Sequence, residues 1–131
     1  MKILIAEDDF CSRKLIQACL NRYGECHLAV NGLEAYEAFV MALREGKPYD
    51  LICLDIMMPD VDGHEALRQI RDKEEQLGIN RKDRVKIIMI TALDDMKAIM
   101  SSYYELCDEY LMKPIDQKTL LEQIRKTGLN I

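Results

Sequence analysis

Two patterns of apolar residues alternate along the chain. One is a short apolar run, and the other is a longer segment with apolar residues at helical spacing. Short runs that are wholly or mostly apolar, typical of strands, occupy residues 3–6, 26–30, 51–54, 85–90 and 109–112. Helical spacing of apolar residues follows each run, at 10–22, 31–45, 64–77, 94–104 and 116–127. Five strand–helix repeats predict βαβ units, in which the strands are parallel and the crossovers right-handed.

The predicted helices have recognisable faces and ends. The first places four apolar residues on one side: Leu15, Ile16, Cys19 and Leu20. The third does the same with Ala66, Leu67, Ile70 and Leu77. Asn31 is a suitable N-cap with Glu34 at the capping-box position, and Asp116 is a suitable N-cap for the last helix.

Composition limits the class of protein. A chain of 131 residues with 49% hydrophobic and 31% charged residues is typical of one soluble globular domain. The net charge of −5 argues against general binding to nucleic acid or to anionic membranes. The chain contains neither an apolar run of membrane-spanning length nor a signal-peptide pattern at its start. We therefore expect a cytoplasmic protein.

The five cysteines indicate neither a disulfide framework nor a zinc site. They are Cys11, Cys19, Cys26, Cys53 and Cys107. Their number is odd, no C-x-x-C motif occurs, and neither of the two histidines has a cysteine at ligand spacing. We expect most of them to be small buried hydrophobic residues in a reducing compartment.

Polar residues stand at the carboxyl ends of four predicted strands: Glu7, Asp8 and Asp9, then Asp55, Thr91 and Lys113. Taken singly, Asp55 fits a turn residue, and Asp9 fits a helix cap. Thr91 fits a helix cap equally well, and Lys113 fits an ordinary surface lysine. In a parallel α/β sheet, however, these strand ends meet at one edge, where such folds bind ligands. Their shared position favours a functional site.

The chemistry of this set favours phosphoryl transfer. Crowded carboxylates repel one another unless a cation neutralises them, and a few oxygen ligands with room for water suit Mg²⁺ better than Ca²⁺. A metal, a lysine and a hydroxyl around one carboxylate would stabilise charge on phosphoryl oxygens. Asp55 would then be the nucleophile that forms an aspartyl phosphate.

Four motifs carry a resemblance to a known family. They are I-L-I-A-E-D-D at 3–9, L-D-I-M-M-P-D-V-D-G at 54–63, I-T-A at 90–92 and D-E-Y-L-M-K-P at 108–114. With these motifs in this order, the chain resembles the receiver domain of two-component response regulators over residues 1–131, most like a stand-alone chemotaxis regulator. The resemblance implies a doubly wound, flavodoxin-like α/β fold with five helices and a five-stranded parallel sheet of order 2-1-3-4-5.

The resemblance also implies roles for the metal and phosphate ligands. Asp55 matches the phosphoacceptor, and Asp8 matches the acid that binds Mg²⁺ directly. Glu7 matches the acid that acts mainly through water, and the backbone carbonyl of Met57 matches the third protein ligand.

A second group matches the positions that respond to phosphorylation. Thr91 matches the switch hydroxyl, Lys113 the phosphate-pairing lysine and Tyr110 the switch aromatic. The resemblance further implies a cis bond between Lys113 and Pro114. The chain departs from the family at 73–84, which is longer than in many receivers. This segment could be a partner surface or solvated charge, and we favour solvated charge. The chain departs also at Leu106 and Cys107, where small residues are common.

The resemblance implies a signalling function rather than turnover of free substrates. A histidine kinase or histidine-phosphotransfer protein would supply the phosphoryl group, and water would later hydrolyse the product. The face of helix four, strand five and helix five would change and contact an unknown target protein, or a second copy of the chain. No output domain follows in the sequence, so we expect a stand-alone regulator.

Three alternatives remain at this stage. The chain could be a phosphate shuttle or sink within a phosphorelay, or an interaction module that is never phosphorylated. It could also be a metal-dependent phosphatase or phosphotransferase with an Asp nucleophile. Met57 disfavours the enzyme, because it stands where such enzymes carry a second Asp, and no glycine-rich phosphate loop occurs.

Overall fold

The strand–helix alternation predicted from the sequence is present in the fold. A computed structural model describes residues 1–56, 63–91 and 106–131. The elements are β1 (Lys2–Ala6), α1 (Phe10–Leu20), β2 (Glu25–Ala29), α2 (Gly32–Arg44), β3 (Leu51–Asp55), α3 (Gly63–Gln76), the 3₁₀ helix η1 (Arg81–Asp83), β4 (Lys86–Thr91), β5 (Glu109–Met112) and α5 (Gln117–Lys126). The predicted helix over 94–104 lies outside the described residues.

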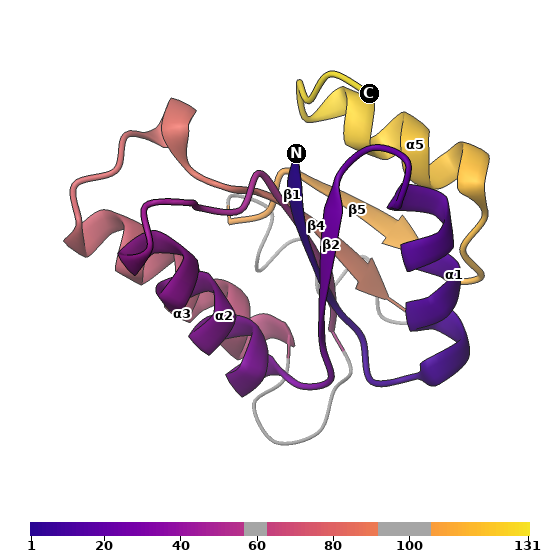
Figure 1. Ribbon diagram of the computed structural model, residues 1–131, viewed down its shortest axis with the longest axis horizontal. Helices are drawn as coiled ribbons and strands as arrows, with labels where there is room; N and C mark the ends of the chain where they lie inside the picture. The colour runs from indigo at the N-terminus through magenta and orange to yellow at the C-terminus, as the bar shows by residue number, and fades with distance from the viewer. Residues whose placement is uncertain (57–62, 92–105) are drawn as a thin grey trace.

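All five strands form one parallel sheet. Their order is β2-β1-β3-β4-β5, which confirms the predicted order 2-1-3-4-5. Helices α2 and α3 cover one face of the sheet, and α1 and α5 cover the other (Figure 1). The chain is therefore a doubly wound α/β domain, and its strands end together at one edge.

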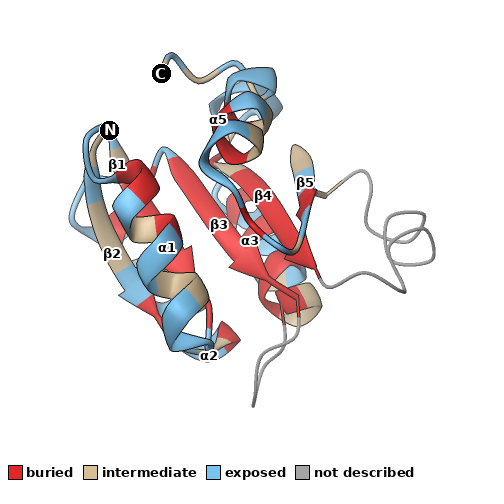
Figure 2. Ribbon diagram, turned by 90° about the vertical axis from the view of Figure 1, so that its right-hand side faces the viewer, coloured by how far each residue is buried: buried red, intermediate tan, exposed pale blue. Residues whose placement is uncertain are grey.

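The central strand is buried on both faces, as its continuous apolar run predicts. Ile52 and Leu54 pack in the core beneath α2 and α3, whereas Leu51 and Cys53 pack in the core beneath α1 and α5. Figure 2 shows β3 and β4 in red, as buried strands. Burial raises the pKa of the Cys53 thiol to about 12, so this thiol is chemically inert.

Two predicted helix caps are confirmed. The Asn31 side chain accepts a hydrogen bond from the Glu34 N–H at 2.8 Å. The Glu34 carboxylate accepts from the Val30 N–H at 3.0 Å, one residue earlier than a capping box requires. Asp116 caps α5 by accepting from the Thr119 N–H at 2.9 Å. Such caps each contribute about 1 kcal/mol to stability.

Two residues predicted to face the core are exposed. Leu15 is 43% exposed because Ile16, Cys19 and Leu20 form the buried stripe of α1, and Leu15 lies beside that stripe. Leu77 is 53% exposed because α3 ends one residue before it and Gly78, with φ of 70°, turns the chain away. The remaining strand and helix bounds differ from the predicted ones by one or two residues.

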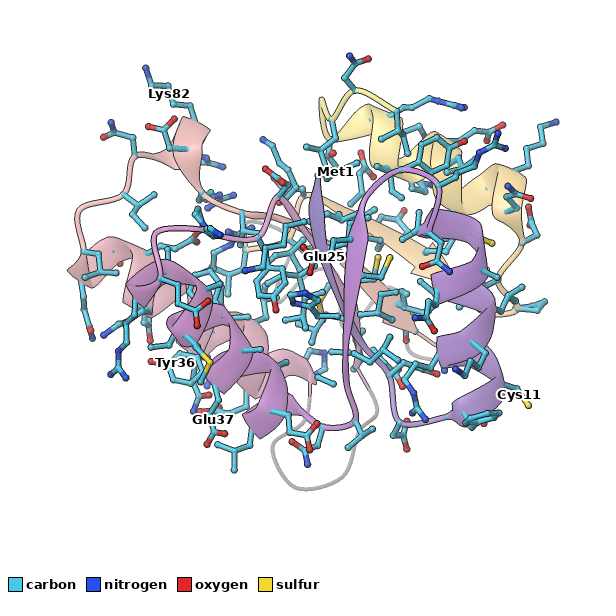
Figure 3. All side chains as sticks on the ribbon, viewed as in Figure 1. Met1, Cys11, Glu25, Tyr36, Glu37 and Lys82 are labelled. Atoms are coloured by element: carbon cyan, nitrogen blue, oxygen red, sulfur yellow. The ribbon has the colours of Figure 1, made fainter. Side chains whose placement is uncertain are left out.

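The interpretation of 73–84 as solvated charge is wrong for Glu74. This carboxylate is buried and forms an ion pair with Arg71 at 2.7 Å, and it accepts the Val85 N–H at 2.8 Å. Arg71 also pairs with Asp108 at 3.0 Å. Farther along the segment, Lys82 projects from η1 at the surface (Figure 3). The segment thus ties α3 to the start of β4.

No helix in the described part of the chain is both long and apolar enough to cross a membrane.

Candidate functional site

Two neighbouring strands deliver three carboxylates to the same edge of the sheet. Glu7 and Asp8 follow β1, and Asp55 is the last residue of β3. The Glu7 N–H donates to the Ala29 carbonyl at 3.0 Å, which extends the pairing of β1 with β2 by one residue. The backbone therefore fixes where these acids leave the sheet.

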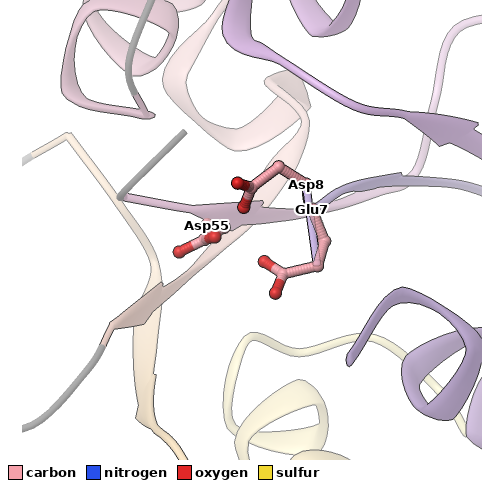
Figure 4. Close-up of side chains that lie close together, drawn as sticks. All are labelled: Glu7, Asp8 and Asp55. Carbon is pink, nitrogen blue, oxygen red and sulfur yellow. The ribbon is translucent and has the colours of Figure 1, made fainter. Parts of the chain in front are cut away.

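The three carboxylates form one cluster. One oxygen of each residue lies within 4.8 Å of the others, and Figure 4 shows the side chains gathered around a common point. Glu7 and Asp55 are buried, at 0% and 2% exposed, whereas Asp8 is exposed. The cluster is therefore open to solvent on the Asp8 side.

The donor set fits a hard divalent cation. It consists of oxygen atoms only, which suits Mg²⁺ or Ca²⁺. Glu7 Oε2 is buried and has no hydrogen-bond partner among the residues that the structure describes. A buried carboxylate oxygen without a partner is costly, and a hydrated cation would provide one.

Lys113 joins the cluster from the end of β5. Its Nζ lies 2.6 Å from Glu7 Oε1 and 3.6 Å from Asp55 Oδ2. Burial lowers the pKa of Lys113, but the hydrogen bond to Glu7 and the charge of Asp55 outweigh burial and raise it above its usual value. The side chain is therefore a cation that compensates part of the negative charge.

The remaining predicted site residues are Thr91, Tyr110 and Met57. Thr91 is buried at the end of β4, and its carbonyl accepts the Lys113 N–H at 2.8 Å. Tyr110 lies on β5 and is 40% exposed. The bond between Lys113 and Pro114 is cis, as predicted. Met57 lies outside the described residues.

Gly63, the last residue of the motif at 54–63, is a site residue to which the sequence analysis gave no role. It begins α3, and its N–H donates to the Ile56 carbonyl at 2.9 Å. A Cβ at this position would lie 2.2 Å from the Asp55 carbonyl oxygen. Only glycine allows α3 to start this close to the end of β3. The D-G pair in the sequence was a signal for a turn, not for this contact.

Arg13 is a second residue that the sequence reasoning missed. Its Nη1 donates to the Glu7 carbonyl at 2.9 Å and to the Asp8 carbonyl at 3.3 Å. Asp9 caps α1, as expected, by accepting the Ser12 N–H at 2.8 Å, and this hydrogen bond lowers the pKa of Asp9. An arginine in the first turn of a helix carries no sequence signal of such a contact.

Comparison with known proteins identifies the family. The family model described as "Response regulator receiver domain" matches residues 3–125. The transcriptional regulatory protein AfsQ1 of Streptomyces coelicolor is 32% identical over 94% of this chain and 49% of its own length. Hybrid signal transduction histidine kinase L of Dictyostelium discoideum is 30% identical over 98% of this chain and 7% of its own length.

A solved structure agrees with these sequence matches. The receiver domain of Ssk1 from Saccharomyces cerevisiae, solved with the histidine phosphotransfer protein Ypd1, is 31% identical, with a TM-score of 0.82 over 98% of this chain and 88% of that chain. The chain spans about half or less of the length of the curated relatives named above. With its sheet order and its cluster of strand-end acids, the chain belongs to the family of response regulator receiver domains.

Proposed function

We propose that Asp55 accepts a phosphoryl group from a phosphohistidine of a histidine kinase or histidine-phosphotransfer protein. The observation that carries this proposal is the position of the Asp55 carboxylate, which clusters with the acids Glu7 and Asp8 and lies 3.6 Å from the Lys113 ammonium. The complex of Ypd1 with the Ssk1 receiver supports a donor of this class. Residues 1–131 would act as one receiver unit.

The acids are proposed to hold Mg²⁺, which would neutralise charge on the phosphoryl oxygens. Asp8 and Asp55 would bind it directly, and Glu7 would act through water. The Met57 carbonyl, outside the described residues, would be the third protein ligand. Glu7 Oε2, which is buried and has no hydrogen-bond partner within residues 1–56, 63–91 and 106–131, supports this assignment.

The bonds that form and break in the transfer step involve only atoms of the chain and its donor. An Asp55 oxygen attacks the phosphorus, and the bond from phosphorus to the donor imidazole nitrogen breaks, leaving its electron pair on the imidazole. Lys113 pairs with a phosphoryl oxygen. Its Nζ lies 3.6 Å from Asp55 Oδ2, close enough to reach a phosphoryl group on that carboxylate. Water later attacks the phosphorus, the bond between phosphorus and the Asp55 oxygen breaks, and inorganic phosphate leaves, so that Asp55 is a carboxylate again.

Phosphorylation is proposed to change the face around β5 and α5. The phosphate carries about 1.5 to 2 negative charges in place of the single charge of the Asp55 carboxylate, and it brings three acceptor oxygens next to Thr91. The Thr91 hydroxyl would donate to it, and Tyr110 would turn inward from its half-exposed position. This face would contact the target protein or a second copy of the chain.

The test is phosphoryl uptake from a small acyl phosphate such as acetyl phosphate, measured by intact-protein mass spectrometry with Mg²⁺ present. Wild-type protein should take up one phosphoryl group, and Asp55→Asn none. Asp72→Asn, an exposed acid on α3, is the matched control and should behave as wild type. Stoichiometric uptake by Asp55→Asn would refute the assignment.

A further inference from the structure

The turn that carries the acidic pair is held from α1 by one side chain. Arg13 Nη1 donates to the carbonyl oxygens of both Glu7 and Asp8, at 2.9 and 3.3 Å. These carbonyls belong to the two peptide groups on either side of the Asp8 α-carbon. Because peptide groups are planar, their orientations set φ and ψ of Asp8. Arg13 therefore fixes the direction in which the Asp8 side chain leaves the backbone.

Asp8 depends on this restraint more than the other acids do. Glu7 and Asp55 are buried, and Lys113 lies against both. The Asp8 side chain is exposed, and no described residue donates a hydrogen bond to its carboxylate. Its place in the cluster is therefore set by its backbone rather than by side-chain contacts.

Arg13 is itself well anchored. Its backbone N–H donates to the Asp9 carbonyl at 2.9 Å, in the helix turn that the Asp9 side chain caps. Its guanidinium carbon lies 5.6 Å from the centroid of the Phe10 ring. Because both its backbone and its guanidinium group are held in place, Arg13 can fix the position of the turn at Asp8 relative to α1.

We propose that Arg13 is a positioning residue for the cation site: it preorganises Asp8 for metal binding without touching the metal. This inference rests on the proposed Mg²⁺ site. Preorganisation by Arg13 and the charge of Arg13 should change the affinity for Mg²⁺ in opposite directions. A guanidinium close to a cation repels it, so its charge alone would weaken binding, whereas preorganisation of a ligand strengthens binding. Removal of Arg13 therefore separates the two effects.

The experiment is calorimetric titration of the unphosphorylated protein with Mg²⁺. Arg13→Gln should weaken binding by about tenfold, the size expected when a residue that orients a metal ligand is lost. Arg13→Lys, which keeps the charge without the planar guanidinium, should also bind more weakly than wild type. Lys14→Gln is the matched control, because Lys14 is exposed and its Nζ lies 5.7 Å from the same Phe10 ring. It should bind no more weakly than wild type.

A second readout distinguishes positioning from loss of folding. Thermal unfolding without metal shows whether each variant is folded. If Arg13→Gln is not folded, the Mg²⁺ titration of Arg13→Lys tests the inference instead. With acetyl phosphate, the Arg13 variants should need more Mg²⁺ for half-maximal phosphorylation but reach a rate close to wild type at saturation. Binding by the folded Arg13 variants as tight as, or tighter than, wild type would overturn the inference alone. Failure of wild-type protein to bind Mg²⁺ would overturn the proposed metal site.

Discussion

The environment of the Asp55 carboxylate combines burial with nearby charges of both signs. The carboxylate is 2% exposed, has two acids beside it, and has the Lys113 ammonium at 3.6 Å. The Asp55 backbone is held from the other side by Gly63, whose missing side chain lets α3 begin against the Asp55 carbonyl. A charge contact and a steric contact thus both help to fix the nucleophile that we propose.

The raised pKa of Lys113 predicts that the free energy of unfolding of the protein depends on pH in the alkaline range. The Lys113 pKa is raised in the folded protein, so its ammonium contributes stability that is complete below the usual lysine pKa of about 10.5. That contribution is lost as pH rises through the folded-state pKa. The difference in free energy of unfolding between wild type and Lys113→Met should therefore shrink at alkaline pH. Urea denaturation from pH 8 upward, about every half unit, measures it.

Lys118→Met, on the exposed side of α5, controls for the loss of one positive charge at the surface. A difference between wild type and Lys113→Met that grows with rising pH would show that Lys113 does not compensate Glu7 and Asp55.

At the scale of elements, α3 is joined to the sheet by a buried charge network as well as by apolar packing. Arg71 contacts Glu74, Asp108 and the carbonyls of Leu106 and Val85, at 2.7 to 3.0 Å. It thereby connects α3 to the starts of β4 and β5, at the edge of the sheet opposite the acids. The network holds the two strands that carry Thr91 and Lys113.

Glu74→Gln should destabilise the protein by about 3 kcal/mol. The substitution removes a buried charge from the pair with Arg71 and replaces an acceptor of the Val85 N–H by an amide. Glu75→Gln, an exposed acid next to it, should change the free energy of unfolding by less than about 0.5 kcal/mol. Equal effects of the two substitutions in urea denaturation would show that the network contributes nothing.

The sequence predicts elements well here and contacts between elements poorly. Apolar runs and caps identified the strands and the helix starts, because both depend on neighbouring residues. The site residues were predictable because parallel strands end at one edge, and a family resemblance then supplied their roles. The contacts of Arg71 and Arg13 depend on how α3 and α1 lie on the sheet, and no local pattern records that. Leu77 failed for a local reason, since α3 ends before it.

For the molecule as a whole, the strand order decides which groups meet. β1 and β3 are neighbours, so their terminal acids form one cluster, and β4 and β5 bring Thr91 and Lys113 to the same edge. Three carboxylates and one ammonium leave this edge negatively charged. The folded protein should therefore bind a divalent cation that the unfolded chain does not, and the cation should stabilise the fold.

Asp8→Asn separates repulsion from metal binding. Without metal, its free energy of unfolding should equal or exceed that of wild type, because one repelling charge is gone. Mg²⁺ at a hundredfold excess over its dissociation constant should stabilise wild type by about 2.7 kcal/mol, and Asp8→Asn by much less. Urea denaturation with and without Mg²⁺ measures both effects. An unchanged increment in Asp8→Asn would remove Asp8 from the metal ligands.

Chemical trapping can show whether the phosphoryl group resides on Asp55. Borohydride reduces an acyl phosphate to an alcohol, which converts a phosphorylated aspartate into homoserine. After phosphorylation with acetyl phosphate and Mg²⁺, reduction and digestion, peptide mass spectrometry locates the converted residue. We expect homoserine at position 55 and at no other acid. Conversion of Asp8 or Asp9 instead, or of no residue in protein shown to carry phosphate, would contradict this expectation.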